Sequence, residues 1–299
     1  MVCVKGFEKP DKGDEMKIAV TGANGKLGRL VIQGLLATQA PEDIVAVVRN
    51  ESRAADLAQL GIQVRVASYE DVPALEAAFA GVDKLLLVSS SEVGKRIPQH
   101  KNAIDAAKTA GVKHVVYTSA PKATTSNLVL APEHKATEEY LASSGLDYTV
   151  LRNGWYTENF LQAVETAKQT GTIVAAAGGG RVASASRADY AAAAVAVLLG
   201  SGHEGEVYEL SGDYAWDYNE LAVAVSEIIG KPVAYQPVDG PTLINILVGA
   251  GLERPTAEFV ATLDENTAAG LLSETSGDLS ALIKRPTTPL REGLKAAMG

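Results

Sequence analysis

From residue 17 onward the chain alternates short apolar runs with longer stretches of helical periodicity. The apolar runs are rich in β-branched residues and carry few charges, which is typical of strands buried on both faces of a parallel sheet. They predict strands over residues 17–21, 44–48, 63–66, 84–88, 114–118 and 148–151. The stretches between them predict helices over residues 27–40, 51–59, 72–78, 99–110 and 133–143.

A glycine follows four of these five helical stretches, at Gly61, Gly81, Gly111 and Gly145. Glycine is favoured just beyond the C-terminus of a helix, where the backbone often turns left-handed. The recurrence indicates five repeated strand–helix units. The sequence therefore predicts an α/β fold, a doubly wound parallel (Rossmann) sheet of at least six strands.

After Asn153 the rhythm changes. Helices are predicted over residues 157–169, 188–199 and 218–229, strands over 207–210 and 232–237, and a mainly helical C-terminus. Ser186 and Asp189 have the S-x-x-D form of a capping box at the start of the second helix. We expect a leader over residues 1–15 that is disordered, a Rossmann domain over 16–153, and a smaller mixed α/β lobe over 154–299. The last boundary is approximate, since the chain can cross back to the first lobe.

Composition narrows the class of protein. Hydrophobic residues make up 46% of the chain, as in a globular protein, and no apolar run reaches the ~20 residues of a membrane span. A net charge of −9 argues against sequence-independent binding of nucleic acid. Cys3 is the one cysteine, so an internal disulfide is excluded. The first residues contain no signal or lipidation motif, and we expect a cytoplasmic protein.

The most informative motif is the segment M-K-I-A-V-T-G-A-N-G-K-L-G at residues 16–28. An apolar strand runs directly into Gly22, Gly25 and Gly28, and a helical pattern follows. Glycines permit a tight turn and close approach of the backbone, and the helix N-terminus faces a pyrophosphate. The spacing G-x-x-G-x-x-G is one residue wider at the front than the usual fingerprint and is typical of short-chain dehydrogenases. It predicts a dinucleotide site.

Arg49 stands at the end of the second predicted strand, twenty-one residues after Gly28. An NAD-specific site carries an acidic residue there to hold the ribose 2′-hydroxyl, whereas an arginine complements a 2′-phosphate. The sequence therefore predicts a preference for NADPH over NADH. The alternative interpretation of Arg49 is a solvated residue at a strand end.

Two further segments fall at the carboxyl ends of predicted strands, where doubly wound sheets bind ligands. Ser89, Ser90 and Ser91 follow the fourth strand, and their small hydroxyl side chains allow ribose and nicotinamide to approach. His134 lies in P-E-H-K, at a predicted helix start near the same rim, and is a candidate proton donor. Solvated side chains or an ordinary turn are the alternative interpretations.

The chain lacks the acid–base pair of ordinary short-chain dehydrogenases. Those enzymes use Y-x-x-x-K, and none of the ten tyrosines here is followed by lysine four residues later. Either the acceptor requires little acid assistance or the protein binds the dinucleotide without turnover. A quinone fits the first option, because its reduction gives a phenolate-type anion whose conjugate acid has a pKa near ~10.

Several segments together resemble one family: G-A-N-G-K-L-G, V-V-R-N, L-L-V-S-S-S-E-V-G, L-R-N-G-W-Y-T-E-N and S-R-A-D-Y-A-A-A-A. The chain from residue 16 onward is similar to the type-2 NADPH:quinone oxidoreductases among the NmrA-like atypical short-chain dehydrogenases. The resemblance implies an NADPH-dependent reductase that transfers a hydride, two electrons at once, to quinones. This chain departs from the family pattern at two positions. Ser68 stands where an aspartate often precedes the tyrosine, here Tyr69, and Asn24 stands where threonine is more usual.

The resemblance also implies which residues bind NADP(H). These are Gly22, Ala23, Asn24, Gly25, Lys26, Leu27, Arg49, Ser89, Ser90, Ser91, Asn153, Gly154, Trp155, Tyr156, Thr157 and Glu158. Arg187 is a further candidate for contact with the cofactor. Asn153 is placed to bond the nicotinamide carboxamide, and Trp155 and Tyr156 offer flat surfaces for ring stacking or, alternatively, pack the lobe interface. Tyr156 joins His134 as a candidate catalytic residue.

Two other functions stay open at this stage. NmrA-like relatives include regulators, so a non-catalytic redox sensor of the NADP(H) ratio is one alternative. The other is a reductase of a different conjugated acceptor, such as a cationic dye held by Glu92 or Glu158. The histidines have no carboxylate or thiol partner at ligand spacing, so we expect no metal. The sequence does not decide the oligomeric state.

Overall fold

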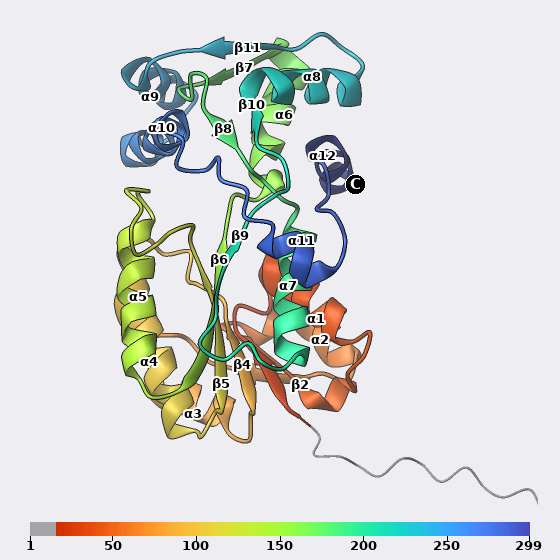
Figure 1. Ribbon diagram of the computed structural model, residues 1–299, viewed down its shortest axis with the longest axis vertical. Helices are drawn as coiled ribbons and strands as arrows, with labels where there is room; N and C mark the ends of the chain where they lie inside the picture. The colour runs from red at the N-terminus through yellow and green to blue at the C-terminus, as the bar shows by residue number, and fades with distance from the viewer. Residues whose placement is uncertain (1–15) are drawn as a thin grey trace, which may run out of the picture.

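The computed structural model describes residues 16–299; the predicted leader, residues 1–15, lies outside this range. Its centre is a seven-stranded parallel sheet in the order β3-β2-β1-β4-β5-β6-β9 (Figure 1). Ala19 in β1, for example, lies opposite Val45 on one side and Leu85 on the other. The strands are β1 (Ile18–Val20), β2 (Ile44–Val48), β3 (Gln63–Val66), β4 (Lys84–Leu87), β5 (His114–Ser119), β6 (Asp147–Asn153) and β9 (Val207–Leu210). The predicted doubly wound sheet is confirmed.

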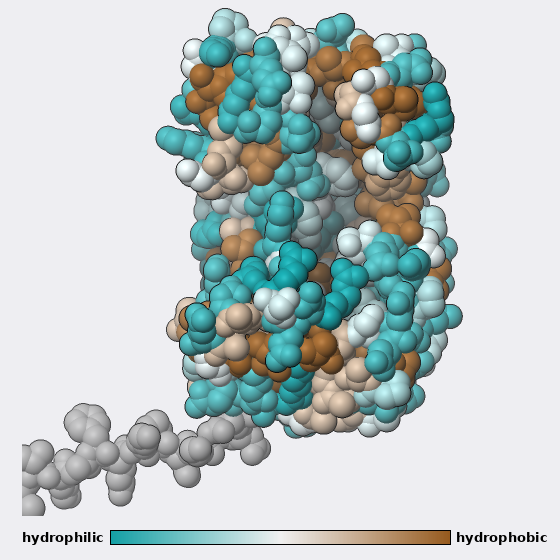
Figure 2. All heavy atoms as spheres, turned by 180° about the vertical axis from the view of Figure 1, so that it is seen from behind, coloured by the Kyte–Doolittle hydropathy of each residue, from teal (hydrophilic) through white to brown (hydrophobic). Residues whose placement is uncertain are grey.

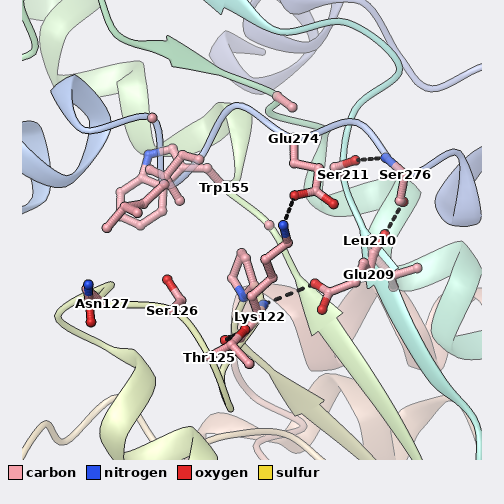
Figure 3. Close-up of a pocket in the computed structure, with 16 residues that line it drawn as sticks. Lys122, Thr125, Ser126, Asn127, Trp155, Glu209, Leu210, Ser211, Glu274 and Ser276 are labelled. Atoms are coloured by element: carbon pink, nitrogen blue, oxygen red, sulfur yellow. Dashed lines mark hydrogen bonds and ion pairs between the residues drawn. The ribbon is translucent and has the colours of Figure 1, made fainter.

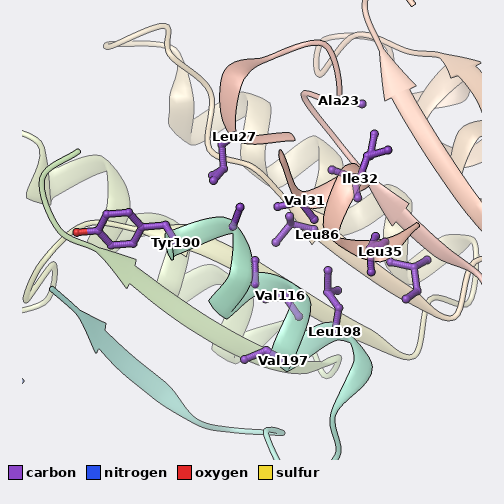
Figure 4. Packing of buried hydrophobic residues seen from close by; sticks show 14 of the residues in the cluster. Ala23, Leu27, Val31, Ile32, Leu35, Leu86, Val116, Tyr190, Val197 and Leu198 are labelled. Carbon is purple, nitrogen blue, oxygen red and sulfur yellow. The ribbon is translucent and has the colours of Figure 1, made fainter. Parts of the chain in front are cut away.

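Helices cover both faces of the sheet because alternate strand residues bury into two separate cores. Ile18 and Val20 point into one core and Ala19 into the other. The first face packs α1 (Lys26–Leu35), α2 (Ala55–Gln59), α7 (Arg187–Leu199) and α11 (Asp278–Ile283); the second packs α3 (Val72–Phe79), α4 (Arg96–Thr109) and α5 (Ala131–Ser143). Figure 4 shows residues of α1 and α7 in this core, with Leu35 of α1 near Leu198 of α7 and Leu27 on the side of Tyr190.

The predicted helices differ from the observed ones mainly at their ends. The first stops at Leu35, five residues early, where the chain turns toward a short 3-10 helix, η1 (Pro41–Asp43). The predicted helix over 51–59 is divided at Ala54 into η2 (Glu51–Arg53) and α2. The glycines just beyond the helix C-termini behave as expected: Gly61, Gly81, Gly111 and Gly145 all have positive φ, between 70° and 82°.

Beyond residue 153 the chain contributes to two parts of the molecule. β9, α7 and α11 join the sheet body, whereas the other elements form a smaller lobe above it (Figure 1). These are η3 (Thr157–Phe160), α6 (Leu161–Thr170), β7 (Thr172–Ala175), β8 (Arg181–Val182), β10 (Trp216–Asp217), α8 (Tyr218–Ile229), β11 (Ala234–Pro237), α9 (Gly240–Gly249), α10 (Arg254–Ala268) and α12 (Leu290–Met298). Two-stranded pairs, β7 with β11 and β8 with β10, make the lobe mixed α/β. No helix within residues 16–299 has both the length and the apolarity to cross a bilayer.

The start of α7 shows how the C-terminal segment is tied to the sheet body. Ser186 accepts a hydrogen bond from the Asp189 N–H, which is half of the expected capping box. The buried Asp189 carboxylate instead accepts bonds from the Ser186 hydroxyl, the Thr288 N–H and Arg285. Burial opposes its charge, but the bonds from Thr288, Ser186 and Arg285 outweigh burial and lower the pKa of Asp189. Asp189 is therefore a structural anchor.

Candidate active site

The glycine-rich loop connects β1 to α1. Gly22 has a φ of 58°, and the Gly25 N–H donates to Gly22 O at 2.7 Å. A Cβ at Gly28 would lie 2.5 Å from Gly22 O, so the turn requires a residue without one. Gly25 is the N-cap of α1 and provides no side-chain cap, which leaves the first N–H groups of the helix free of a capping side chain. This end of α1 suits an anion.

The other loop residues fix the turn or stand exposed beside it. Ala23 is buried and its N–H donates to Val47 O at 3.3 Å. Asn24 donates from Nδ2 to Asn50 O at 3.2 Å, so the loop is tied to the end of β2. Leu27 is buried in the core beneath α1, and Lys26 is exposed in the first helical turn. The arrangement holds the loop against the two strands that flank a dinucleotide in this fold class.

Arg49 lies one residue beyond β2, with 68% of its side chain exposed. Its Nη1 is 2.8 Å from Oε1 of Glu92, which follows the serine segment. Lys95 lies 3.3 Å from the other oxygen of Glu92. Lys95 and, more weakly, Arg49 hold the pKa of Glu92 below its ordinary value. The guanidinium is thus exposed, close to the glycine loop and paired with a carboxylate that an incoming phosphate can replace.

The serine segment is held by its backbone. The Ser89 N–H donates to Thr118 Oγ1, and the Ser90 N–H donates to Nε2 of His100, each at 2.9 Å. Arg96 Nε donates to Ser90 O at 2.6 Å. Ser91 is exposed. The segment is therefore fixed at the carboxyl end of β4 while its side chains remain at the rim.

His134 lies in the interior, between α5 and β5. It is 4% exposed, and its Nδ1 is 2.7 Å from the hydroxyl of Tyr117. Burial, aided by the positive charge of Arg96, lowers the pKa of His134 to about 3. The imidazole is consequently neutral near pH 7, and it does not line the cavity described below. Its role as proton donor stays a prediction.

The segment after β6 contains a buried polar atom without a partner. Asn153 donates from Nδ2 to the Tyr156 hydroxyl at 3.2 Å, while its Oδ1 is buried and has no hydrogen-bond partner among residues 16–299. The ring of Tyr156 packs edge-on against Tyr190, and the Arg187 guanidinium lies 4.7 Å from its centroid. Buried polar atoms are normally satisfied, so the free amide oxygen indicates a ligand donor.

Thr157 and Glu158 fix this segment to the start of α7. Thr157 is buried, with Oγ1 2.9 Å from Ser184 Oγ. Both Glu158 carboxylate oxygens accept from the Arg187 N–H, at 2.9 and 3.0 Å. Glu158 therefore caps α7 and helps to orient Arg187 over Tyr156.

A cavity of about 350 Å³ lies where the sheet body meets the lobe. Its wall comes from the carboxyl ends of β5, β6 and β9 and from the loop between α10 and α11 (Figure 3). The lining comprises Pro121, Lys122, Thr125, Ser126, Asn127, Gly154, Trp155, Ala183, Glu209, Leu210, Ser211, Gly270, Leu271, Leu272, Glu274 and Ser276. Seen from behind, the surface is hollowed between body and lobe (Figure 2).

Three charged residues of the cavity were not found by sequence reasoning. Lys122 forms an ion pair with Glu274, and the Lys122 N–H donates to Glu209 Oε2 at 3.1 Å (Figure 3). They come from three segments that together span some 150 residues of the chain, and none belongs to a recognisable motif. The available signal was the position of Lys122, three residues beyond the end of β5, at the ligand-binding edge of the sheet.

The residues present fit a dinucleotide. The open N-terminus of α1, the crowding that excludes a side chain at Gly28 and the free Oδ1 of Asn153 lie at the same edge of a parallel sheet. Fold and site define the class as Rossmann-type dinucleotide-binding proteins with an adjoining cavity for a second ligand.

Comparison with known proteins gives the family. Residues 22–200 match the family described as NAD(P)H-binding. The chain is 50% identical to quinone oxidoreductase 2 of Escherichia coli over 277 residues, which cover 93% of this chain and 97% of that one. This protein belongs to the NAD(P)H-binding family, and its cofactor is NADP(H), as the motifs predicted.

Solved structures agree with this assignment. The crystal structure of the E. coli NADPH-dependent quinone oxidoreductase complexed with NADPH has a TM-score of 0.91 at 49% identity, covering 94% of this chain and 100% of that one. Triphenylmethane reductase from Citrobacter sp. gives a TM-score of 0.91 at 42% identity, covering 95% and 99%. The resemblance stated from the sequence is confirmed.

Proposed function

We propose that this protein is an NADPH-dependent oxidoreductase that reduces quinones by two-electron hydride transfer. The observation that carries the proposal is the cavity lined by Gly154 and Trp155, which directly follow Asn153 and its free amide oxygen in the chain. The 50% identity to quinone oxidoreductase 2 over nearly the whole chain supports the quinone as acceptor.

The cofactor is held along the carboxyl edge of the sheet. Gly22 to Leu27 and the N-terminus of α1 hold the pyrophosphate, and Arg49 holds the 2′-phosphate after exchanging its contact with Glu92. Ser89 to Ser91 border the ribose. Bound NADPH supplies the hydride, and the residues of this chain bind, orient and shield the reactants.

The nicotinamide end is held by the segment from Asn153 to Glu158. The Asn153 Oδ1 accepts from the carboxamide, which satisfies the buried atom that the protein leaves unpaired. Arg187 lies over Tyr156 and contacts the same end of the cofactor. Tyr156 fixes Asn153 through its hydroxyl and acts as a positioning residue.

The acceptor enters the cavity against Trp155. An indole face packs well on a planar conjugated ring, and a cavity of about 350 Å³ accommodates a small quinone. Proximity and orientation supply most of the rate, because a quinone needs little acid assistance. The lack of Y-x-x-x-K is compatible with this chemistry.

The charges of the cavity favour a neutral acceptor over a cationic dye. Glu209 is paired with Arg152 at 2.7 Å, and Glu274 with Lys122. The carboxylates suggested from sequence for a dye, Glu92 and Glu158, do not line the cavity. A cytoplasmic location and the lack of nucleic-acid partners stay predictions from the sequence.

The test is loss of NADPH absorbance with purified protein and 1,4-benzoquinone, with NADH run in parallel. We expect turnover with one hydroquinone formed for each NADPH consumed, and slower turnover with NADH. Tight NADPH binding without turnover across several quinones would contradict the proposal and favour the redox sensor.

A further inference from the structure

Among the residues within 16–299 that line the cavity, Lys122 is the one cation. It lies three residues beyond β5, and half of its side chain is exposed. Figure 3 shows the side chain extending from the loop toward Glu274 on the opposite wall, with Trp155 across the cavity. An ammonium group therefore stands in the space where the acceptor binds.

The backbone of Lys122 is in the left-handed region, with a φ of 45°. This conformation is unfavourable for a residue with a Cβ, and such strain is concentrated at functional sites. It is maintained by the surrounding contacts: the Lys122 N–H donates to Glu209, and the Lys122 carbonyl accepts from the N–H groups of Thr125 and Ser126 at 2.8 and 2.7 Å. The loop thus holds one side chain in a fixed direction.

Both carboxylates of the cavity already have partners. Glu209 accepts from Arg152 Nη1 at 2.7 Å and from the Lys122 N–H at 3.1 Å. Glu274 is the ion-pair partner of Lys122. Lys122 has three donor hydrogens, so its ammonium can hold Glu274 and still donate to a ligand.

We propose that Lys122 forms a phenolate subsite: its ammonium binds the oxygen that becomes negative during acceptor reduction and then donates a proton to it. This inference rests on the proposed quinone reduction. Hydride addition reduces the quinone to its hydroquinone monoanion as NADPH is oxidised. An N–H bond of Lys122 then breaks as the hydroquinone O–H bond forms, and solvent returns the proton to the amine.

The energetics of this proton transfer are nearly balanced. The phenol formed has a pKa near ~10, close to that of a lysine ammonium. Glu274, through its ion pair, and to a lesser extent Glu209 raise the pKa of Lys122, so the ammonium is present throughout the neutral range.

The test measures binding without turnover. The probe is 4-nitrophenol, added to the full-length protein saturated with NADP⁺ at one pH above and one below the pKa of the probe, with quenching of tryptophan fluorescence as the signal. We expect wild type to bind the anion about tenfold more tightly than the neutral phenol. Lys122→Met loses this preference, Lys122→Arg retains it, and Lys231→Met, at an exposed lysine away from the cavity, behaves as wild type.

The variant Lys122→Gly distinguishes loss of the anion subsite from a loss of stability. Glycine relieves the positive φ, so this variant should melt at a higher temperature than wild type and still lose the preference for the anion. Equal affinity of Lys122→Met and wild type for the anion would overturn the inference. Absence of quinone turnover in wild type would overturn the proposed function instead, because the binding assay does not depend on turnover.

Discussion

The backbone N–H of Ser90 donates a hydrogen bond to Nε2 of His100 at 2.9 Å. The other ring nitrogen, Nδ1, is 2.9 Å from Thr137 Oγ1. Burial, and secondarily the charge of Arg96, lower the pKa of His100 to about 3. The ring is therefore neutral near pH 7 and its Nε2 remains an acceptor. A buried histidine of α4 thus fixes the serine segment.

We predict that His100 supports NADPH binding by holding the Ser90 backbone in place. His100→Leu removes the acceptor for the Ser90 N–H, and the Kd for NADPH should rise about tenfold, equivalent to about 1.4 kcal/mol. His100→Gln provides an oxygen near the position of Nε2 and should bind NADPH within about threefold of wild type. Equal affinities of the Leu variant and wild type in a titration of NADPH would show that the segment does not need this anchor.

Arg49 should determine the choice between NADPH and NADH. In Arg49→Asp the 2′-phosphate loses its cation and meets a carboxylate, so the ratio of kcat/KM for NADPH over NADH should invert. Glu92→Gln removes the competing anion and should strengthen NADPH binding by a few fold at low salt. Steady-state kinetics with both cofactors test this, and an NADPH preference retained in Arg49→Asp would contradict the assignment.

Gly28 should be intolerant of a side chain. In Gly28→Ala the new Cβ meets Gly22 O at 2.5 Å and Ala23 Cα at 2.9 Å, so the loop must shift. We expect a loss of about 1–3 kcal/mol in the free energy of unfolding and at least a tenfold rise in the Kd for NADPH. The matched control is Gly249→Ala in α9, where no atom lies within 4 Å of the added Cβ. This variant should be neutral or more stable by about 0.5–1 kcal/mol, with unchanged NADPH binding.

The stability of the protein should fall in acid because His134 is buried in its neutral form. Its pKa is about 3 in the folded state against an ordinary value of 6.5, so between these values the unfolded chain binds the proton and the folded chain does not. The contribution of His134 is complete above pH 6.5 and is lost as the pH falls toward 3, at up to about 1.4 kcal/mol per pH unit.

Comparison with a variant isolates this contribution. His134→Asn places an oxygen near Nδ1, within reach of the Tyr117 hydroxyl, and it does not titrate. Urea titrations give the free energy of unfolding of wild type and of His134→Asn. Between pH 6.5 and 5.5, wild type should lose about 1 kcal/mol relative to the variant. The opposite contribution of Asp264, whose pKa burial raises to about 6, cancels in the difference. A pH-independent difference would mean that the pKa of His134 is the same in the folded and the unfolded protein.

The sequence by itself determined the sheet, the glycine loop and the cofactor class. Strands buried on both faces read as short β-branched runs, and the turn after β1 imposes glycine at Gly22 and Gly28 through backbone conformation and close approach. The role of Arg49 stays a prediction, made because strand ends in this fold have defined roles. These signals are local, so they can be recognised in the sequence alone.

Only the tertiary structure decided which residues face the second ligand. His134, a candidate proton donor in the sequence, and Lys122, which no motif marked, both follow β5, yet His134 is buried against Tyr117 while Lys122 enters the cavity. Glu209 and Glu274 reach the same cavity because β9 adds to the sheet beside β6 and the α10–α11 loop folds over it. Such placement depends on long-range packing between segments that share no periodicity, and no local pattern encodes it.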